Sequence, residues 1–511
     1  MLQDSRWPVI LYILTGVLSV STIYFAVFLI EIPDSMTIIM CALLAVFGIL
    51  SFLYTCRNLK TRIALVLFGF SAMTISVMGN YCNPYWNSTS FRRTTLPASL
   101  SADALLGTEA AKEDLEYVMH YLKKLHPAFY EKIPTEVAAE YENMLKQLEN
   151  QTSVSVCELT RMAESVVAVL RDSHSQVRRS EETMHYLKDM YKFKDLMAVN
   201  GIKMEDLMRQ TENLYSYEMD QWHLRRLKFD CLSLEGLQYL GFRPENGITY
   251  TIERDDGKQI EMIYCAEDFL PGNGSAAGSE TNLQAGTAEA NQGTKKSFVS
   301  YEIINDYNTA VLKLDSCQNN EEYKSCLRNM FAEVKRREIS NVAVDLRNNT
   351  GGNSGVIHEF IRYLDVDLYN ISKTQWRLGW FMKTAESGIA ENDRYEDLTF
   401  RGRVYILTSS STFSSAMLFA EYIQDNNLGL LIGEAPGEPP DSYGDTVSFI
   451  LPNSKLVLTV STKKFFRVDQ NRPGDILEPD IPCDGQAAME MLYGTIWLEE
   501  WMREATVEEA K

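Results

Sequence analysis

The sequence predicts an α/β protein with a mostly parallel sheet, preceded by a helical region and by membrane-spanning helices. The sheet is predicted because apolar strands alternate with amphipathic helices through residues 298–497. The helical region is predicted because apolar residues in 108–170 recur at the helical spacing of 3.6. The membrane helices are predicted from three apolar runs in residues 1–82. With 511 residues, the chain is long enough for two or three domains.

The predicted membrane anchor occupies residues 1–82. Its apolar runs, 8–30, 36–55 and 63–79, each have about the length that spans a bilayer. A signal peptide is the competing interpretation of the first run, but that run lacks a basic start and a small-residue cleavage site. Loop 31–35 is acidic and loop 57–62 is basic, which places the second loop in the cytoplasm. We therefore expect a multi-pass protein of the cell membrane, with a cytoplasmic N-terminus, contact with membrane lipid, and an extracytoplasmic domain after residue 80.

The net charge and the cysteine pattern argue against several classes of function. The formal net charge of −20 argues against a nucleic-acid partner and against broad adhesion to anionic lipid. The nine cysteines are scattered without a CxxC pair, so no zinc or redox framework is visible. We expect neither a metal nor a cofactor.

Three segments lie between the predicted anchor and the α/β core. The first, 100–185, should contain helices at 108–126, 135–148 and 155–170, the last leading into the polar loop 171–175. The second, 186–270, closes with a predicted hairpin, 250–253 with 259–263, around Asp256-Gly257. The third, 271–297, consists of small and polar residues and should be a flexible linker or a disordered loop.

The predicted core, 298–497, follows the usual order of an α/β layer. Strands are expected at 310–314, 342–346, 403–407 and 429–432, helices at 321–338, 355–364 and 415–424, and a hairpin at 447–451 with 455–461.

Two turns in this core carry chemistry. Gly351-Gly352 follows a buried strand and allows backbone N–H groups to converge where no side chain intrudes. Ser414 lies in a strand-to-helix turn, where a serine is exposed at the positive end of a helix dipole. Each turn has a plainer interpretation, the glycines as a tight turn and the serine cluster as a helix cap. Together they indicate an oxyanion hole and a nucleophile, the two groups that acyl transfer most needs.

A serine nucleophile needs a base, and the chain has six histidines. His174 is the best placed, because it lies between Asp172 and Ser175 in a polar loop at a helix end. His126 precedes a proline and is better suited to capping or packing. His358 lies on the helix after the glycine pair and should face solvent or the sheet.

On these residues, the chain resembles the tail-specific (C-terminal processing) serine peptidases. The shared elements are Asp-Leu-Arg-Asn-x-x-Gly-Gly at 345–352, Thr-x-Ser-Ser-Ala at 412–416, Ile-Gly-Glu at 432–434 and Glu-Pro-Asp-Ile at 478–481. Upstream, 113–115, 125–127 and 170–175 resemble the branch of the tricorn core and the interphotoreceptor retinoid-binding protein. That branch usually has Asp-Gly-His-Thr where this chain has Asp-Ser-His-Ser. The resemblance covers roughly 100–490.

The resemblance implies a ClpP/crotonase-like core, with Ser414 as nucleophile. The oxyanion hole would be formed by the backbone N–H groups of Ser415 and of Gly351 or Gly352. The Ser/Lys branch keeps a lysine about two dozen residues after the serine, but Glu438 stands there in this chain. A Ser-Lys dyad is therefore not expected.

In the tricorn-like branch the base is the histidine of the Asp-x-His motif, which corresponds to His174. A carboxylate near the Pro-Asp-Ile segment orients that histidine. Asp469, Asp475 and Glu478 are the candidates for this third member, with Asp469 ranked first. The segment 186–270 stands where tail-specific peptidases carry a PDZ module, so it is either a PDZ-like peptide clamp or a structural β insertion.

The sequence therefore predicts a membrane-anchored serine endopeptidase, a hydrolase that cleaves extracytoplasmic peptides or proteins with Ser414 and His174. The rival is a non-catalytic ligand- or peptide-binding protein on the same fold. An acidic residue at position 438 further suggests cleavage inside chains or after basic residues, rather than obligatory trimming at a free C-terminus.

Overall fold

The computed structural model describes most of the chain after residue 98. The described residues are 7–28, 34–54, 63, 66–74, 85, 88–89, 98–180, 183–188, 193, 196–254, 257–271, 297–378, 381–472 and 476–509. Most of the predicted linker at 271–297, the basic loop 57–62 and Asp475 lie outside these residues. The domain boundaries proposed from the sequence stay predictions.

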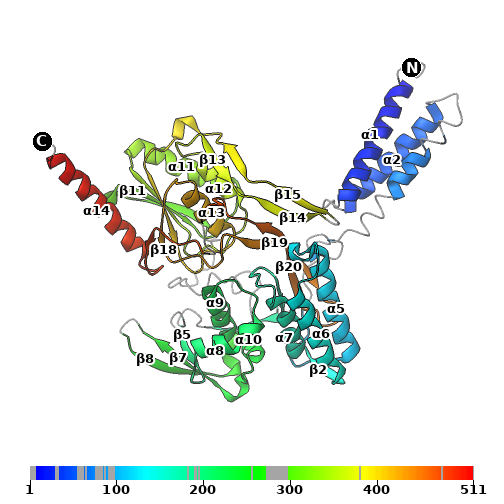
Figure 1. Ribbon diagram of the computed structural model, residues 1–511, viewed down its shortest axis with the longest axis horizontal. Coiled ribbons are helices and arrows are strands. Elements are labelled where there is room, and N and C mark those ends of the chain that lie inside the picture. The colour runs from blue at the N-terminus through cyan, green and yellow to red at the C-terminus, as the bar shows by residue number, and fades with distance from the viewer. Residues whose placement is uncertain are drawn as a thin grey trace.

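The N-terminal region corrects the predicted membrane anchor. Two helices, α1 (Trp7–Phe28) and α2 (Asp34–Tyr54), lie side by side, apart from the rest of the molecule (Figure 1). Within the described part of the chain, however, no helix combines the length and the apolarity that crossing a bilayer requires. This finding contradicts the three transmembrane helices and the multi-pass membrane localisation. The third apolar run, 63–79, is described only at 63 and 66–74.

The helical subdomain agrees with the predicted helices. It contains β1 (Leu105–Gly107), α5 (Thr108–Leu125), α6 (Thr135–Glu149), β2 (Ser153–Ser155), α7 (Val156–Ala168) and β3 (Gln176–Arg178). Helix α7 begins where the Ser155 hydroxyl accepts a hydrogen bond from the Glu158 N–H, at 3.1 Å. Its apolar face packs with α5 and α6 into one core. The loop between α7 and β3 carries His174.

Next along the chain is a mixed insertion with its own hydrophobic core. Its helices are α8 (Met204–Gln210), α9 (Asp220–Cys231) and α10 (Leu234–Tyr239). An antiparallel sheet has the strand order β6-β5-β7-β8, and β4 pairs with β9. These strands are β4 (His185–Leu187), β5 (Leu196–Val199), β6 (Ile202–Lys203), β7 (Ile248–Glu253), β8 (Gln259–Tyr264) and β9 (Phe269–Pro271). Strands β7 and β8 form the hairpin that the sequence predicted.

The core is built on a six-stranded sheet of order β10-β11-β12-β17-β18-β21. Its strands are β10 (Val299–Ile304), β11 (Thr309–Leu314), β12 (Asn341–Asp345), β17 (Arg403–Thr408), β18 (Leu430–Gly433) and β21 (Ile481–Pro482). All neighbours pair in parallel except β10 with β11. The mostly parallel α/β core is thus confirmed.

Helices cover both faces of this sheet, as parallel sheets require. On one face, α11 (Glu321–Arg337), α12 (Gly355–Ile361) and α13 (Ser415–Asp425) pack on alternate strand residues such as Leu312 and Val344. On the other face, α14 (Ala488–Glu509) packs on Val311, Ala343 and Tyr405. Because the parallel strands β12, β17 and β18 end at one edge, the turns that follow them meet there.

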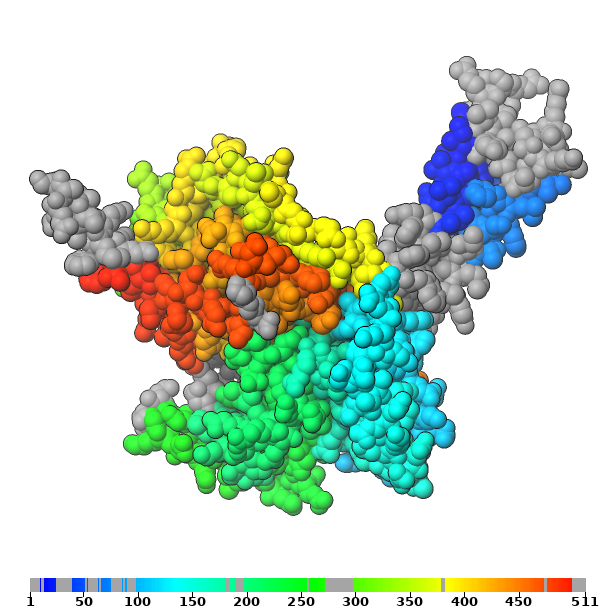
Figure 2. Space-filling view, viewed as in Figure 1, coloured from blue at the N-terminus to red at the C-terminus, as the bar shows by residue number. Residues whose placement is uncertain are grey.

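A second sheet joins the core to the helical subdomain. It has the order β15-β14-β20-β19, and β3 pairs with β20. Its core strands are β14 (Thr374–Leu378), β15 (Phe381–Ala385), β19 (Ser442–Ile450) and β20 (Val457–Phe465), and a small ribbon pairs β13 (Leu368–Ile371) with β16 (Gly388–Glu391). Strand β20 lies against α5 (Figure 1), and the helical subdomain and insertion sit together beneath the core (Figure 2). Because β3 pairs with β20, the loop that contains His174 lies near the sheet edge where the turn after β17 is found.

Candidate active site

Ser414 occupies a strained turn between β17 and α13. Its backbone dihedrals are φ 53° and ψ −127°, a positive-φ conformation that a non-glycine residue adopts only when its surroundings enforce it. Two hydrogen bonds anchor the turn to the neighbouring β12 turn: Phe413 N–H donates to the Asn349 carbonyl at 3.0 Å, and the Thr412 hydroxyl donates to the Leu346 carbonyl at 3.0 Å. The turn is therefore built to hold one residue, Ser414, in a fixed and unusual conformation.

The glycine pair lies against this turn and has no room for side chains. Gly351 and Gly352 have φ values of 104° and 135°. A Cβ on Gly351 would lie 2.6 Å from Ser414 Cβ, and one on Gly352 would lie 2.3 Å from the Cys317 carbonyl oxygen. Only glycine satisfies both the backbone conformation and the close approach.

The structure distinguishes between the two glycines. The Gly351 N–H already donates to the Asn349 side-chain oxygen at 2.8 Å. Gly352, in contrast, lines the same cavity as Ser414 and Ser415, and its carbonyl accepts a hydrogen bond from the Ser415 hydroxyl at 2.8 Å. Gly352 and Ser415 are therefore better placed than Gly351 to present N–H groups to an oxyanion.

Asp172 holds the loop that carries His174. Its buried carboxylate accepts hydrogen bonds from the Ser175 hydroxyl at 2.5 Å and from the His174 N–H at 2.9 Å. It also contacts His126 Nε2 at 3.1 Å. Burial alone would raise the pKa of Asp172, but the hydrogen bond and charge of His126, with help from His174 and Ser175, hold that pKa well below its usual range. His126, as expected, packs and caps, since its Nδ1 accepts from the Ala128 N–H at 3.2 Å.

His174 and Ser414 meet at one cavity of about 390 Å³, although they belong to different subdomains. The imidazole stacks on Phe413, the residue before Ser414, with ring centroids 4.6 Å apart. Its Nδ1 lies 3.5 Å from Glu438 Oε2, and neither ring nitrogen makes a hydrogen bond of good geometry in the described structure. Burial lowers the pKa of His174, opposed by Asp172 and the main chain at Tyr443, and this favours the neutral imidazole that a general base requires.

Glu438 is the carboxylate beside His174. Its side chain is only 1% exposed although it lines the cavity. Burial raises the pKa of Glu438 well above its usual value, and the neighbouring Glu218 carboxylate adds to that rise, while a hydrogen bond from the Ser414 main chain opposes it. Sequence reasoning noticed that Glu438 replaces a lysine but did not connect it with His174. The signal that could have found this residue is its place about two dozen residues after Ser414, where related peptidases keep a catalytic group.

Two of the three carboxylates expected near the C-terminal end of the core, Asp469 and Glu478, do not line this cavity. Asp469 accepts from the Asn471 N–H at 3.0 Å and pairs with Arg472 at 3.7 Å, and it is not among the residues that line the cavity. Glu478 is exposed. Asp475 lies outside the described residues.

One family model matches the part of the chain that contains Ser414 and Glu438. Residues 308–483 match the model of peptidase family S41. These residues form an S41 peptidase domain. The match supports a serine peptidase. A comparison with curated protein sequences gives no match.

Solved structures show the same fold over a longer stretch. Mature CPAF complexed with lactacystin is 13% identical, with a TM-score of 0.53, covering 78% of this chain and 98% of that one. Another structure of mature CPAF is 12% identical, with a TM-score of 0.50 and coverage of 76% and 95%. The photosystem II D1 C-terminal processing protease is 10% identical, with a TM-score of 0.41 and coverage of 74% and 94%. The likeness to CPAF shows that the fold extends beyond the S41 domain. The placement in the tricorn-like branch stays a prediction.

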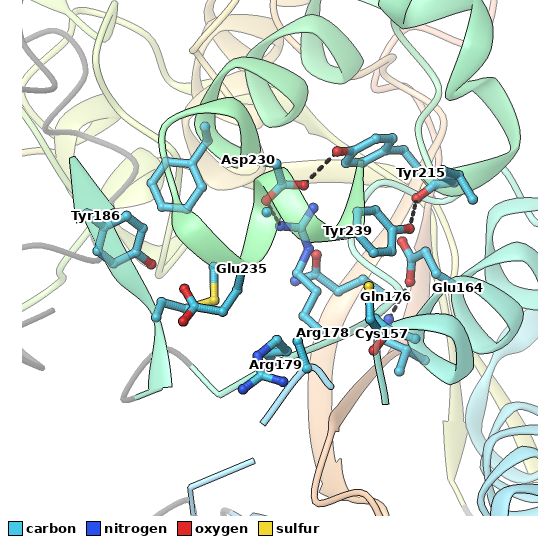
Figure 3. A pocket seen from close by; sticks show the side chains of 17 residues that line it. Cys157, Glu164, Gln176, Arg178, Arg179, Tyr186, Tyr215, Asp230, Glu235 and Tyr239 are labelled. Atoms are coloured by element: carbon cyan, nitrogen blue, oxygen red, sulfur yellow. Dashed lines mark hydrogen bonds and ion pairs between the residues drawn. The ribbon is translucent and has the colours of Figure 1, made fainter. Parts of the chain in front are cut away.

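A smaller cavity of about 120 Å³ lies behind the His174 loop, between α7, β3 and the insertion (Figure 3). Several polar groups of its walls pair with one another. The Tyr215 hydroxyl donates to Asp230 at 2.6 Å, Arg178 lies 3.5 Å from the same carboxylate, and Val177 N–H donates to Glu164 at 2.5 Å (Figure 3). Strand β3 begins two residues after His174. It contacts the insertion through Arg178 and Asp230, and it pairs with β20 of the S41 domain.

Replacing Asp172 by asparagine should lower the free energy of unfolding at pH 7 by about 2–4 kcal/mol, because a buried carboxylate with several hydrogen bonds is lost. The folded-state pKa of Asp172 is depressed, so its stabilisation is fully present above the unfolded pKa and is lost as the pH falls towards the folded pKa. The gap between wild type and variant should therefore shrink when urea unfolding is repeated below pH 4. A gap that is equal at both pH values would contradict this, and Asp469→Asn, at a half-buried site, is the control.

Proposed function

We propose that the protein is an endopeptidase in which Ser414 is the nucleophile, His174 the general base and Glu438 the carboxylate that orients the imidazole. One observation carries the proposal. Ser414, His174 and Glu438, together with Gly352 and Ser415, come from separate segments of the chain and line a single cavity. This set contains every group that acyl transfer through a serine requires.

The mechanism follows from the placement of the two imidazole nitrogens. Nδ1 faces Glu438, and when Glu438 is ionised its carboxylate accepts the Nδ1 proton, which leaves Nε2 as the acceptor. His174 Nε2 removes the hydroxyl proton of Ser414 while Oγ attacks the peptide carbonyl carbon. The N–H groups of Gly352 and Ser415 stabilise the oxyanion, each contributing a factor of roughly 10²–10³.

Collapse of the tetrahedral intermediate breaks the C–N bond, and His174 transfers the proton to the leaving amine. A water molecule then attacks the acyl-enzyme, giving its proton to His174, and hydrolysis releases the acid product and restores Ser414. Ser414, His174, Glu438 and the two N–H donors supply every protein group that this reaction sequence uses.

The charges around the cavity favour cleavage inside a chain. Apart from His174, Lys463 is the one cation among the described residues that line the cavity, and it pairs with Asp445 at 2.5 Å. A free C-terminal carboxylate would therefore meet Asp445 without a cation reserved for it. Glu438 is too buried to act as an exposed selector for basic side chains, as the sequence suggested, and we assign it to the positioning of His174 instead.

Replacing Glu438 by glutamine should lower kcat by roughly 10³–10⁴-fold, because the wrong imidazole tautomer is then favoured. The measurement is hydrolysis of peptides blocked at both ends, so that cleavage of such peptides by wild type also tests the endopeptidase assignment. The matched control is Asp469→Asn, which should keep nearly full activity because Asp469 does not line the cavity. Loss of activity in Asp469→Asn with retention in Glu438→Gln would return the role to the carboxylate first chosen from the sequence. Failure of wild type to cleave blocked peptides that it cleaves with a free C-terminus would contradict the endopeptidase assignment.

A further inference from the structure

We propose that Trp222, on helix α9 of the insertion, is a positioning residue for the catalytic pair. It lies within residues 216–225, here called the bridge segment. This segment contacts both the loop 171–175 that carries His174, here called the base loop, and the turn 409–414 that carries Ser414, here called the nucleophile turn. The inference rests on the proposed roles of Ser414 and His174 and adds a residue from a different subdomain.

The first observation is a continuous aromatic stack. The Trp222 ring lies parallel to Phe413, at 3.8 Å between centroids and 2° between planes. Phe413 in turn stacks on His174, at 4.6 Å and 29°. Phe413, which directly precedes Ser414, is buried in the hydrophobic core of the insertion rather than in that of its own domain. The residue next to the nucleophile is therefore clamped between the catalytic base and the insertion.

Trp222 also touches the loop that carries Glu438. A Cβ placed on Gly437 would lie 3.0 Å from Trp222 Cε3, so the Gly437 backbone lies close to the indole ring. One side chain thus contacts the residue before Ser414 and the residue before Glu438. Removing the ring would free both neighbours at once.

The rest of the bridge segment ties the same two loops together. The Ser216 hydroxyl accepts from the Asp172 N–H at 3.0 Å and donates to the Asp172 carbonyl at 2.6 Å. The Glu218 carboxylate accepts hydrogen bonds from the Ser173 N–H, at 2.8 Å, and from the Ser173 hydroxyl. At the other end, the Arg225 guanidinium donates to the Ser411 hydroxyl. The base loop is held by the start of the segment and the nucleophile turn by its end.

The N–H group of the Trp222 indole, unpaired within the described part of the chain, indicates that this residue was not selected for stability alone. Trp222 is 4% exposed, and its Nε1–H is buried without a hydrogen-bond partner among the described residues. Leaving a buried donor unsatisfied is costly, and a phenyl ring would avoid that cost. An aromatic ring stacked on Phe413 and close to Gly437 is what the side chain provides at this position.

The test compares Trp222→Ala, Trp222→Phe and Phe229→Ala in the full chain. Phe229 is the matched control, because it is a buried aromatic residue of the same helix and core that packs on Tyr186 instead of the turn. Trp222→Ala should lower kcat and the rate at which a fluorophosphonate labels Ser414 by about 10–100-fold, the usual result of misplacing reacting groups, with a smaller change in KM. Trp222→Phe should restore most of the loss, and Phe229→Ala should stay within about threefold of wild type once the folded fraction, followed by circular dichroism, is taken into account.

The pH profile separates positioning from simple loss of folded protein. Without Trp222, Phe413 no longer lies fixed on the imidazole, so water reaches His174 and relieves the burial that lowers its pKa. The acidic limb of kcat/KM should then move to higher pH. A lower folded fraction would reduce the amplitude without moving the limb. Other charged and titratable groups near the His174 imidazole also influence the acidic limb of the pH profile. They are Asp172, Glu218, Glu438, Tyr443, Asp445 and Lys463.

Two results would overturn the inference while the proposed function stands. One is labelling of Trp222→Ala at the wild-type rate. The other is an equal loss in Trp222→Ala and Phe229→Ala at equal folded fractions, with no shift of the acidic limb. Failure of the wild type to be labelled at Ser414 would instead remove the proposed function itself, and the inference with it.

Discussion

Replacing Ser414 by alanine should reduce peptide hydrolysis by a factor of roughly 10⁴–10⁶ while the melting temperature stays nearly unchanged. The variant loses the only atom that attacks the substrate. The backbone strain at φ 53° is the same for alanine as for serine, and the hydrogen bonds that anchor the turn come from Thr412 and Phe413. Hydrolysis of a blocked peptide and a thermal melt on the same preparation give both quantities.

Ser411→Ala is the control for this prediction. Ser411 lies in the same turn but is 2% exposed and serves as an acceptor for Arg225. It should therefore keep most of the activity. If Ser411→Ala were inactive and Ser414→Ala active, the nucleophile would be Ser411.

Replacing His174 by glutamine should cost nearly as much as replacing Ser414, and the double variant should be no worse than either single variant. The reason is that nucleophile and base act as one unit, so their losses do not add. Glutamine retains polarity at the base position but cannot accept and return a proton during the reaction. The measurement is kcat for the two single variants and the double variant. Losses that multiply would mean that Ser414 and His174 act independently, contrary to the mechanism.

Sequence reasoning found the parts of this protein that depend on local pattern. The alternation of strands and helices defined the α/β core, since a parallel strand such as β12 is apolar along its whole length. The Gly351-Gly352 pair and the serine turn were visible because backbone constraints leave a signature in residue type. Their meeting at one cavity with His174 depends on the pairing of β3 with β20, which no local pattern encodes.

The remaining parts depend on tertiary contacts. Asp469 was preferred as the third member from its position near the C-terminal end, whereas the fold places Glu438 3.5 Å from His174 Nδ1. Trp222 and Glu218 belong to an insertion whose sequence carries no sign that it touches the catalytic loops. The membrane helices show a different error. Apolar content over 8–30, 36–55 and 63–79 suggested bilayer spans, but no described helix meets the length and apolarity that a span needs.

The most direct test of the catalytic assignment is to label the full-length wild-type protein with a fluorophosphonate and map the modified residue by mass spectrometry. We expect one adduct, on Ser414, that forms much more slowly in His174→Gln. An adduct on Ser411 or another serine, or labelling of Ser414 at the same rate without His174, would contradict it.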